Sequence, residues 1–251
     1  MSPVARRTLV VIPTYQEAEN VAVVLTRLRR AVPEADVLVV DSDSPDGTAD
    51  LAEKLAEELG AIEVLRQGAK RGLGAAYRDG FAQGLRRGYR VLVEMDADLS
   101  HDPASLPSLL GAIDDGAALA IGSRYVPGGA IPEWPALRRL VSRAGNRYVG
   151  LALGIDVRDA TAGFRAYTAE VLGAIDYGST RADGYGFQVE MAYRVVRAGG
   201  RVVEVPITFA DRVRGSSKMS GRIVVEAMAL VTWWALRDRV LRRSRPLTPP
   251  R

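Results

Sequence analysis

The 251-residue sequence contains no cysteine and only one histidine, His101. The lack of cysteine excludes disulfide bonds, thiolate catalysis and cysteine-based zinc sites, and a single histidine excludes metal sites built from several imidazoles. No Gly-x-Ser-x-Gly elbow accompanies that histidine to suggest a catalytic triad. No uncharged apolar run approaches the ~20 residues that cross a bilayer. The N-terminus passes almost directly into a predicted strand, so we expect neither a transmembrane segment nor a signal peptide.

The composition is that of an ordinary soluble globular protein, with 47% hydrophobic and 25% charged residues. The length allows one large α/β domain or two small ones. The net charge of +4 and the sequence pI of about 9.5 make the chain mildly basic. This balance fits an anionic ligand or an anionic surface better than dedicated nucleic-acid binding, so we expect no nucleic-acid partner.

Strand, loop and helix alternate along most of the chain. Short apolar, β-branched runs predict strands at residues 8–12, 37–40, 62–65, 91–94, 119–122 and, at an edge, 202–206. Helical apolar spacing predicts helices at 20–31, 49–59, 75–87, 106–113, 137–153, 187–198 and 223–241. Segments 124–132 and 159–165 are expected to be loops, Thr48 is a candidate N-cap, and Gly60 is the expected helix stop. The alternation predicts an α/β fold with a mostly parallel central sheet and helices on both faces.

Two aspartates, Asp96 and Asp98, follow the predicted strand at 91–94. Alternate residues of an extended chain point to the same side, and ligands of open α/β sheets bind beyond the carboxyl ends of the strands. Such a carboxylate pair suits a hard divalent cation whose other ligands are waters and substrate phosphates. The alternative is a strand that runs into an acidic, solvated loop.

Polar and charged residues follow the three preceding strands as well. Tyr15 and Glu17 come after the first strand, Asp41 after the second, and Lys70 and Arg71 after the third. Parallel strands bring these loops to one edge of the sheet. Acids there can accept hydrogen bonds from a base and a ribose, and the basic pair can neutralise a diphosphate. The pattern therefore indicates a nucleotide-diphosphate site, although Asp41 could be only a turn residue and the basic pair only solvated.

The glycine-containing segment 72–76 follows the third strand and is similar to a dinucleotide-binding loop. The third glycine of Gly-x-Gly-x-x-Gly is absent, and the motif follows the third strand rather than the first. A flexible loop that lets the backbone approach a phosphate explains the segment equally well. A nucleotide-dependent oxidoreductase is therefore disfavoured.

The motifs at 11–17, 40–48, 71–74 and 95–101 resemble those of the inverting GT-A glycosyltransferases of family 2. More narrowly, the motifs at 122–129, 163–165, 184–191 and 215–219 resemble the polyprenol-phosphate (dolichol-phosphate) mannose synthases. The resemblance extends over residues 8–220, which implies a GT-A catalytic domain at 1–220 and a C-terminal amphipathic helix with a basic tail at 221–251. One departure concerns the usual Val-Asp-Asp motif, which here reads Val40-Asp41-Ser42-Asp43 and displaces the second acid by one residue.

The resemblance implies transfer of mannose from GDP-mannose to a polyprenyl monophosphate, with inversion to a β-mannosyl phospholipid. The acceptor phosphate has a second pKa near ~6 and is largely dianionic at neutral pH, so it needs no general base. What the site must supply is positioning and charge neutralisation. Two alternatives remain open: the same reaction with UDP-glucose, and a non-catalytic module that binds nucleotide sugars.

The resemblance also assigns roles to individual residues. The catalytic residues would be Asp96, Asp98 and Arg124, and the acceptor phosphate would bind Arg124 and Arg138. Mg²⁺ or Mn²⁺ would be held by Asp96 and Asp98, with Ser100 as a weaker ligand candidate. The donor would be bound by Pro13, Tyr15, Glu17, Asp41, Lys70, Arg71, Asp96, Ala97, Asp98, Glu190, Arg212 and Lys218.

The predicted C-terminal helix at 223–241 is too apolar to be left in water, yet its uncharged run of about 10 residues is too short to span a bilayer. It could pack on the core. It could instead lie at a membrane interface, with Trp233 and Trp234 near the headgroups and a basic end against anionic lipid. A lipid acceptor implies peripheral association with the cytoplasmic face of a membrane and makes a membrane-embedded partner protein plausible.

Overall fold

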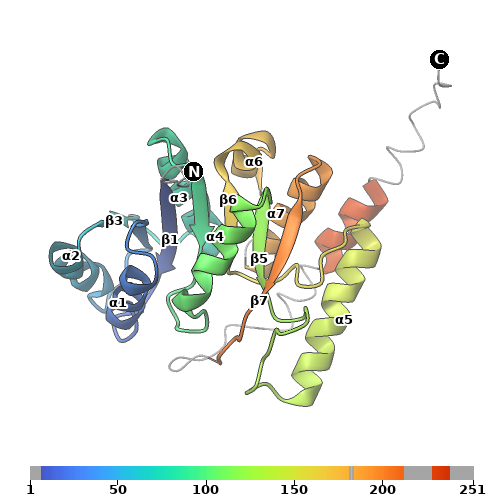
Figure 1. Cartoon of the computed structure of the whole chain (residues 1–251), viewed down its shortest axis with the longest axis horizontal. Helices are drawn as coiled ribbons and strands as arrows, with labels where there is room; N and C mark the ends of the chain where they lie inside the picture. Colours follow the sequence, from blue (N-terminus) through green and yellow to red (C-terminus); the bar gives the residue numbers. More distant parts are fainter. Residues whose placement is uncertain (1–6, 181, 183, 212–227, 238–251) are drawn as a thin grey trace.

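Seven strands form one sheet at the centre of the molecule. They are β1 (Thr8–Thr14), β2 (Asp36–Asp41), β3 (Ile62–Arg66), β4 (Val91–Glu94), β5 (Leu119–Ser123), β6 (Arg165–Thr168) and β7 (Val202–Pro206). Their order in the sheet is β3-β2-β1-β4-β6-β5-β7 (Figure 1). All neighbouring strands are parallel except the two pairs that involve β6. The structure is a computed structural model that describes residues 7–180, 182, 184–211 and 228–237.

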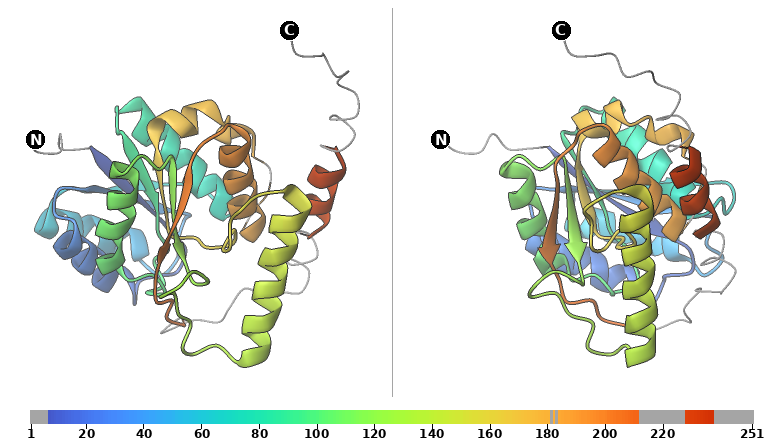
Figure 2. Two further views of the ribbon diagram at one scale, coloured as in Figure 1. Left: turned by 45° about the vertical axis from the view of Figure 1, so that its right-hand side comes forward. Right: turned by 90° about the vertical axis from the view of Figure 1, so that its right-hand side faces the viewer.

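Helices cover both faces of the sheet (Figures 1 and 2). One face carries α1 (Val21–Ala31), α2 (Thr48–Leu59) and α4 (Leu106–Asp114), and the other carries α3 (Leu73–Arg86), α6 (Ala169–Ala174) and α7 (Tyr185–Arg197). The longest helix within the described residues, α5 (Ala136–Leu153), runs along one side of the molecule (Figure 2), and two short 3₁₀ turns lie at Pro103–Ser105 and Tyr177–Ser179. Because alternate β1 residues enter opposite cores, a continuous apolar run is needed there. The predicted α/β fold is confirmed.

The expected strands and helices before residue 124 are present, with ends that differ by one or two residues. The prediction for Thr48 as N-cap is wrong, because α2 begins at Thr48 itself and its N-cap is Gly47, which has a left-handed φ of 80°. The Thr48 hydroxyl instead donates to Asp46 at 2.6 Å. Gly60 does end α2, as predicted, with its N–H donating to the carbonyl of Ala56.

The sequence predicts a loop at 159–165, but Arg165 begins β6, an antiparallel strand in the interior of the sheet. Arg165 is fully buried. Its guanidinium donates to the carbonyls of Ala160, Ala162 and Gln188, each at 2.7 Å. A strand of four residues that begins with a buried arginine has no apolar periodicity to reveal it.

The described part of the C-terminal segment, residues 228–237, is helical and only partly buried. Trp234 packs into the core, where its ring stacks on Tyr193 with centroids 6.1 Å apart. Trp233 is 55% exposed, so of the two alternatives for this helix, packing on the core holds for Trp234, and contact with a membrane stays open for Trp233 alone of the two tryptophans. Within the described residues, no helix has the length and apolar character needed to cross a bilayer. The rest of the predicted helix at 223–241 and the proposed domain boundary after residue 220 lie outside the described residues.

Candidate active site

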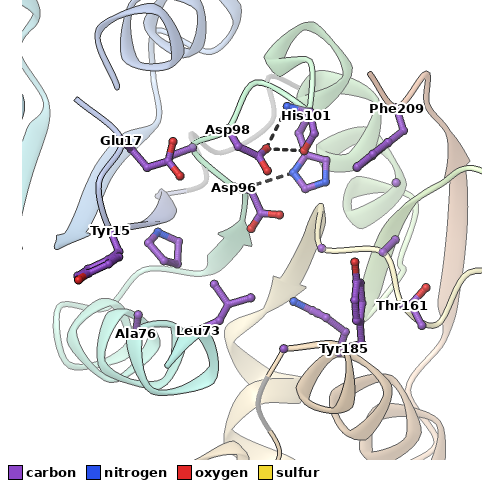
Figure 3. A pocket seen from close by; sticks show the side chains of 18 of the residues that line it. Tyr15, Glu17, Leu73, Ala76, Asp96, Asp98, His101, Thr161, Tyr185 and Phe209 are labelled. Carbon is purple, nitrogen blue, oxygen red and sulfur yellow. Dashed lines mark hydrogen bonds between the residues drawn. The ribbon is translucent and has the colours of Figure 1, made fainter. Parts of the chain in front are cut away.

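A cavity of about 430 Å³ lies beyond the carboxyl ends of β1 and β4 (Figure 3). Tyr15 and Glu17 stand on one side of it, and Tyr185 and Thr161 stand on the other, with Asp96 between them. The cavity therefore occupies the sheet edge at which the sequence analysis placed a nucleotide-diphosphate site.

Most of the predicted site residues line this cavity. They are Pro13, Tyr15, Glu17, Lys70, Asp96, Ala97, Asp98, Ser100, Arg124 and Arg138. Asp41, Arg71 and Glu190 do not line it. Arg212 and Lys218 lie outside the described residues.

The acid pair is held in place by short local contacts. Asp98 accepts hydrogen bonds from the backbone N–H of Ser100 at 3.1 Å and from its hydroxyl at 2.6 Å. This contact needs a tight turn, which Leu99 supplies with a φ of 64°. The backbone N–H of Asp96 donates to Nδ1 of His101 at 3.2 Å (Figure 3). His101 thus stabilises the loop that presents the two carboxylates, a role that the sequence analysis missed.

Aromatic side chains contact both His101 and Asp96. His101 stacks on Phe164 and meets Phe209 edge-on, with centroids 5.2 and 5.7 Å away. The hydroxyl of Tyr77 donates to Asp96 Oδ1 at 3.2 Å. Burial and the nearby Asp96 charge raise the pKa of Tyr77 well above its usual value, so this hydroxyl remains a donor.

The acid pair fits a hard divalent cation that shares its coordination with a substrate. Among the residues that the structure describes, no cluster brings three Asp, Glu, His or Cys side chains together as metal ligands. Mg²⁺ and similar ions are commonly held by one or two carboxylates, with waters and substrate phosphates completing the shell. The Ser100 hydroxyl donates to Asp98 and so orients this carboxylate.

On the β1 side of the cavity, a lysine ammonium group lies over an aromatic ring. Lys70 Nζ lies 3.6 Å from the centroid of the Tyr15 ring. Glu17 accepts a hydrogen bond from Asn20 Nδ2 at 2.8 Å, and its backbone N–H donates to Thr48 Oγ1 at 2.9 Å. These contacts hold the loop after β1 against the start of α2.

The retained acid of the Val40-Asp41-Ser42-Asp43 motif, Asp41, lies behind the cavity rather than in its wall. Asp41 is buried and accepts hydrogen bonds from the Thr14 hydroxyl at 2.7 Å and from the backbone and side chain of Ser44. The residue that lines the cavity here is Ser42, whose hydroxyl donates to Gln67 at 2.9 Å. Arg71 pairs with Asp79 on α3.

Arg124 is buried in the cavity wall beside a carboxylate that the sequence analysis did not identify. Its Nε and Nη2 atoms donate to the two carboxylate oxygens of Asp159 at 2.7 and 2.6 Å. Nη2 also donates to Thr161 at 2.9 Å. Burial opposes the charged form of Arg124, but the charge and hydrogen bonds of Asp159 outweigh it and raise the arginine pKa. The partner lies 35 residues away in sequence, so no local pattern could have revealed it.

Two other predicted residues have defined partners. Glu190 accepts hydrogen bonds from Arg194, one helical turn later on α7, at 2.7 and 3.1 Å. Arg138 lies 3.9 Å from the centroid of the Trp134 ring, and its Nη1 donates to Asp211 at 3.3 Å. Arg138 and Trp134 both line the cavity.

Gln188 is a further cavity-lining residue that the sequence analysis did not identify as a site residue. It is only 2% exposed, and its side-chain amide lies next to the carboxylate of the buried Glu94. Its backbone carbonyl is held by Arg165. An amide with both a donor and an acceptor suits a ligand hydroxyl group.

Glu94 lies two residues before Asp96 and is completely buried. Its carboxylate lies next to the side chains of Gln188, Tyr167 and Arg165. Burial raises the pKa of Glu94 to about 7, although the charge of Arg165 opposes the shift. This carboxyl therefore changes charge near neutral pH.

Replacing Glu94 by glutamine is expected to raise the free energy of unfolding at pH 8 by roughly 3 kcal/mol. The carboxyl titrates at 4.5 when unfolded and at about 7 when folded. Between these two pKa values the folded state binds more protons than the unfolded state. The stability that the protonated carboxyl contributes is therefore fully present below pH 4.5 and is lost as the pH rises towards the folded-state pKa, by about 1.4 kcal/mol per pH unit. Urea unfolding from pH 4.5 to 8 measures the difference between wild type and Glu94→Gln. Parallel profiles would contradict the raised pKa.

The fold is that of the GT-A transferases of nucleotide sugars. The chain superposes on glucosyl-3-phosphoglycerate synthase from Mycobacterium tuberculosis with a TM-score of 0.67 at 21% identity, covering 92% of this chain and 80% of that chain. It also superposes on mannosyl-3-phosphoglycerate synthase from Rubrobacter xylanophilus with a TM-score of 0.66 at 20% identity, covering 98% and 78%. At these identities the likeness concerns the fold alone.

Residues 9–175 match the family model described as "Glycosyl transferase family 2", and the chain belongs to this family. It is 54% identical to undecaprenyl-phosphate mannosyltransferase from Micrococcus luteus, over 93% of this chain and 96% of that protein. It is 51% identical to polyprenol monophosphomannose synthase from Mycolicibacterium smegmatis, over 94% of this chain and 89% of that protein.

Proposed function

We propose that the protein transfers mannose from a nucleotide-activated donor to a polyprenyl monophosphate and forms a β-mannosyl phosphoryl polyprenol. The observation that carries this proposal is the likeness to two polyprenyl-phosphate mannosyltransferases at 51% and 54% identity over almost the whole chain. The cavity agrees with it, because the acid pair faces a space of about 430 Å³. We further propose GDP-mannose as the donor.

In this reaction an oxygen of the acceptor phosphate forms a bond to C1 of mannose while the bond from C1 to the nucleotide diphosphate breaks. The attack comes from the face opposite the leaving group, so the configuration at C1 inverts. No proton has to move, because the acceptor phosphate is already largely dianionic at neutral pH, with a second pKa of about 6. The protein therefore contributes alignment and charge neutralisation.

The residues around the cavity divide between these two tasks. Asp96 and Asp98 would hold Mg²⁺ or Mn²⁺, which when bound neutralises the diphosphate leaving group. Tyr77, His101 and Ser100 would keep the acid pair aimed, since they contact it directly. For the donor we propose contacts with Pro13, Tyr15, Glu17, Lys70, Ala97, Arg212 and Lys218, and for the acceptor phosphate with Arg124 and Arg138.

In this proposal the remaining donor candidates do not contact the donor; they support the turn and the helices that border the cavity. Asp41 would fix the turn at Ser42, which lines the cavity. Arg71 and Glu190 would stabilise α3 and α7 through Asp79 and Arg194. Because the acceptor tail stays in the bilayer, we place the protein at the cytoplasmic face of a membrane, with or without a membrane-embedded partner protein.

The test is a donor panel with a short polyprenyl phosphate, in which GDP-mannose is compared with UDP-glucose with and without EDTA. We expect a mannosyl lipid from GDP-mannose, a much slower reaction with UDP-glucose, and no product after chelation. Addition of Mg²⁺ or Mn²⁺ in excess of EDTA is expected to restore activity. A preference for UDP-glucose would overturn the donor assignment, and no transfer from either donor would overturn the proposed reaction.

Replacing Gln188 by leucine is expected to lower kcat/KM for GDP-mannose about tenfold or more, because a buried hydroxyl group of the sugar would lose its partner. Leucine keeps the volume and removes both polar atoms. The matched control is Gln83→Leu, a half-buried residue of α3 that does not line the cavity, which should leave kcat/KM unchanged. Equal values for the two variants would show that Gln188 does not contact the sugar.

A further inference from the structure

The departure in the Val40-Asp41-Ser42-Asp43 motif leaves one position of the cavity wall without a carboxylate. Ser42 stands where the usual motif has its second aspartate, and it lines the cavity. Asp43 does not replace that aspartate, because it is exposed, has a left-handed φ of 61° and does not line the cavity. A group that only accepts hydrogen bonds is therefore exchanged here for a hydroxyl, which can donate or accept.

The backbone of the sheet fixes the place of the Ser42 hydroxyl. Strands β2 and β3 are parallel, and backbone hydrogen bonds continue one residue beyond each of them. The N–H of Ser42 donates to the carbonyl of Thr14 at 3.0 Å. The N–H of Gln67 donates to the carbonyl of Asp41 at 2.8 Å. Ser42 and Gln67 are thus buried neighbours at the ends of two adjacent strands.

Side-chain hydrogen bonds lead from Ser42 to helix α3. The Ser42 hydroxyl donates to Oε1 of Gln67 at 2.9 Å, and Nε2 of Gln67 donates to Oδ2 of Asp79 at 2.6 Å. The same carboxylate oxygen of Asp79 accepts a hydrogen bond from Nη2 of Arg71. We refer to the side chains of Ser42, Gln67, Asp79 and Arg71 as the Ser42 network.

The donors and acceptors of the Ser42 network can be arranged in only one way. An ionised carboxylate only accepts and a guanidinium only donates, so neither group has a choice of role. Asp79 therefore requires the NH₂ group of Gln67, which turns the amide oxygen of Gln67 towards Ser42. Because the Ser42 hydroxyl gives its only proton to that oxygen, it can offer a ligand only a lone pair. The network thus makes a serine act as the aspartate of the usual motif would.

The position of Ser42 indicates which part of a nucleotide it meets. Ser42 follows β2, whereas Asp96 and Asp98 follow β4, and β1 lies between these two strands. Two strand spacings separate the two points by about 10 Å. A nucleoside diphosphate whose phosphates lie at the acid pair extends first its ribose and then its base away from the pair. The base, at the far end, therefore reaches the ends of β2 and β3.

We propose that Ser42 accepts a hydrogen bond from the base of the donor nucleotide, and that Gln67 and Asp79 are positioning residues that impose this role. The ligand group is an N–H on the edge of the base, such as N1–H of guanine. Adenine has an unprotonated N1 at this place and is selected against, whereas uracil, with its N3–H, meets the same requirement as guanine. This inference rests on the proposed function for the presence of a nucleotide donor.

The first experiment measures the dissociation constants of GDP and ADP for the full chain by calorimetry, with Mn²⁺ and without an acceptor. We expect wild type to bind GDP about tenfold more tightly than ADP. Ser42→Ala removes the acceptor atom and should weaken GDP binding about fivefold or more, with little effect on ADP. The matched control is Ser179→Ala, an exposed serine that does not line the cavity and whose loss should leave both constants unchanged.

Asp79→Asn tests the direction of the network. The new amide can donate to Oε1 of Gln67, which lets the Gln67 amide turn over and donate to Ser42. The Ser42 hydroxyl is then able to donate to N1 of adenine, so the preference for GDP over ADP should fall about fivefold or more. The control is Asp50→Asn, which removes the carboxylate partner of Arg66 outside the cavity and should leave the preference unchanged.

The double variant Gln67→Glu/Asp79→Asn exchanges the two groups and keeps the net charge. A carboxylate at position 67 accepts from both Ser42 and the amide at position 79, so Ser42 again offers only a lone pair. We expect this variant to regain the preference for GDP that Asp79→Asn loses, which damage to the structure would not allow. The proposal is overturned if Ser42→Ala and Asp79→Asn keep the wild-type preference, or if the double variant does not regain it. Circular dichroism checks that the variants fold.

A third ligand, 2′,3′-dideoxy-GDP, separates the base from the ribose. Ser42→Ala should weaken its binding by the same factor as that of GDP, and an effect on GDP alone would assign Ser42 to the ribose and overturn the proposal. Wild type that binds neither GDP nor ADP would also overturn it. If the expected preferences appear but no mannosyl lipid forms, the proposed function fails and the role of Ser42 stands. Normal mannosyl transfer with unchanged preferences in the variants would overturn the role of Ser42 alone.

Discussion

Replacing Asp98 by alanine is expected to lower turnover about 10³-fold or more and to leave the fold intact. Asp98 lines the cavity on the loop after β4, where its carboxylate is held by the backbone and the hydroxyl of Ser100. Without this carboxylate, the charge that develops on the diphosphate leaving group would lose a metal ligand and the neutralisation that the metal provides. Turnover with GDP-mannose and far-UV circular dichroism measure the two parts of the prediction.

The matched control for this variant is Asp102→Ala. Asp102 lies four residues further along the same loop and caps the short 3₁₀ turn by accepting a hydrogen bond from the N–H of Ala104. Its loss should cost about 1 kcal/mol of stability and little turnover. Turnover close to wild type in a folded Asp98→Ala protein would refute the assignment of Asp98 to the metal.

The second large effect is expected on stability, when Asp159 is replaced by alanine. Asp159 is completely buried and forms a bidentate ion pair with Arg124, which is only 5% exposed. Removing the carboxylate leaves a buried guanidinium without its counter-charge, at a cost of about 3–5 kcal/mol. Chemical denaturation of both proteins at neutral pH measures the change.

Glu53→Ala provides the comparison for an exposed ion pair. Glu53 pairs with Arg66 at 2.8 Å, and both side chains are about half exposed. Its removal should change the free energy of unfolding far less than the removal of Asp159 does, because water and salt screen an exposed ion pair. If Asp159→Ala costs no more than Glu53→Ala, the Arg124–Asp159 pair does not stabilise this wall of the cavity.

The fold could be predicted where the sequence repeats a simple period. The buried parallel strands β1, β2 and β4 are apolar on both sides, and the helices between them carry apolar residues at helical spacing, so both patterns can be recognised. Strand β6 has only four residues and begins with Arg165, whose burial depends on carbonyl groups from two other segments. The sequence gives no sign of such contacts, because they form only when these segments meet in the folded protein.

The candidate site likewise contains residues that the sequence could place and residues that it could not. Asp96, Asp98 and Glu17 could be placed because each follows a strand whose end lies at the same edge of the sheet. The ion pair of Arg124 with Asp159 and the burial of Gln188 depend on how distant segments pack, so neither could be foreseen. The contact between Glu190 and Arg194 is an exception, since acid and base four residues apart on a helix are a recognisable pair.

Arg165 has a consequence for attempts to redesign sugar selectivity. Its guanidinium joins the carbonyls of Ala160 and Ala162 to that of Gln188, so the loop before β6 and the first turns of α7 are tied through one side chain. A library that varies only the loop or only the helix would work against this shared anchor. A library should therefore vary residues of both segments together and keep Arg165 unchanged, because this residue holds the two segments in their relative positions beside the cavity.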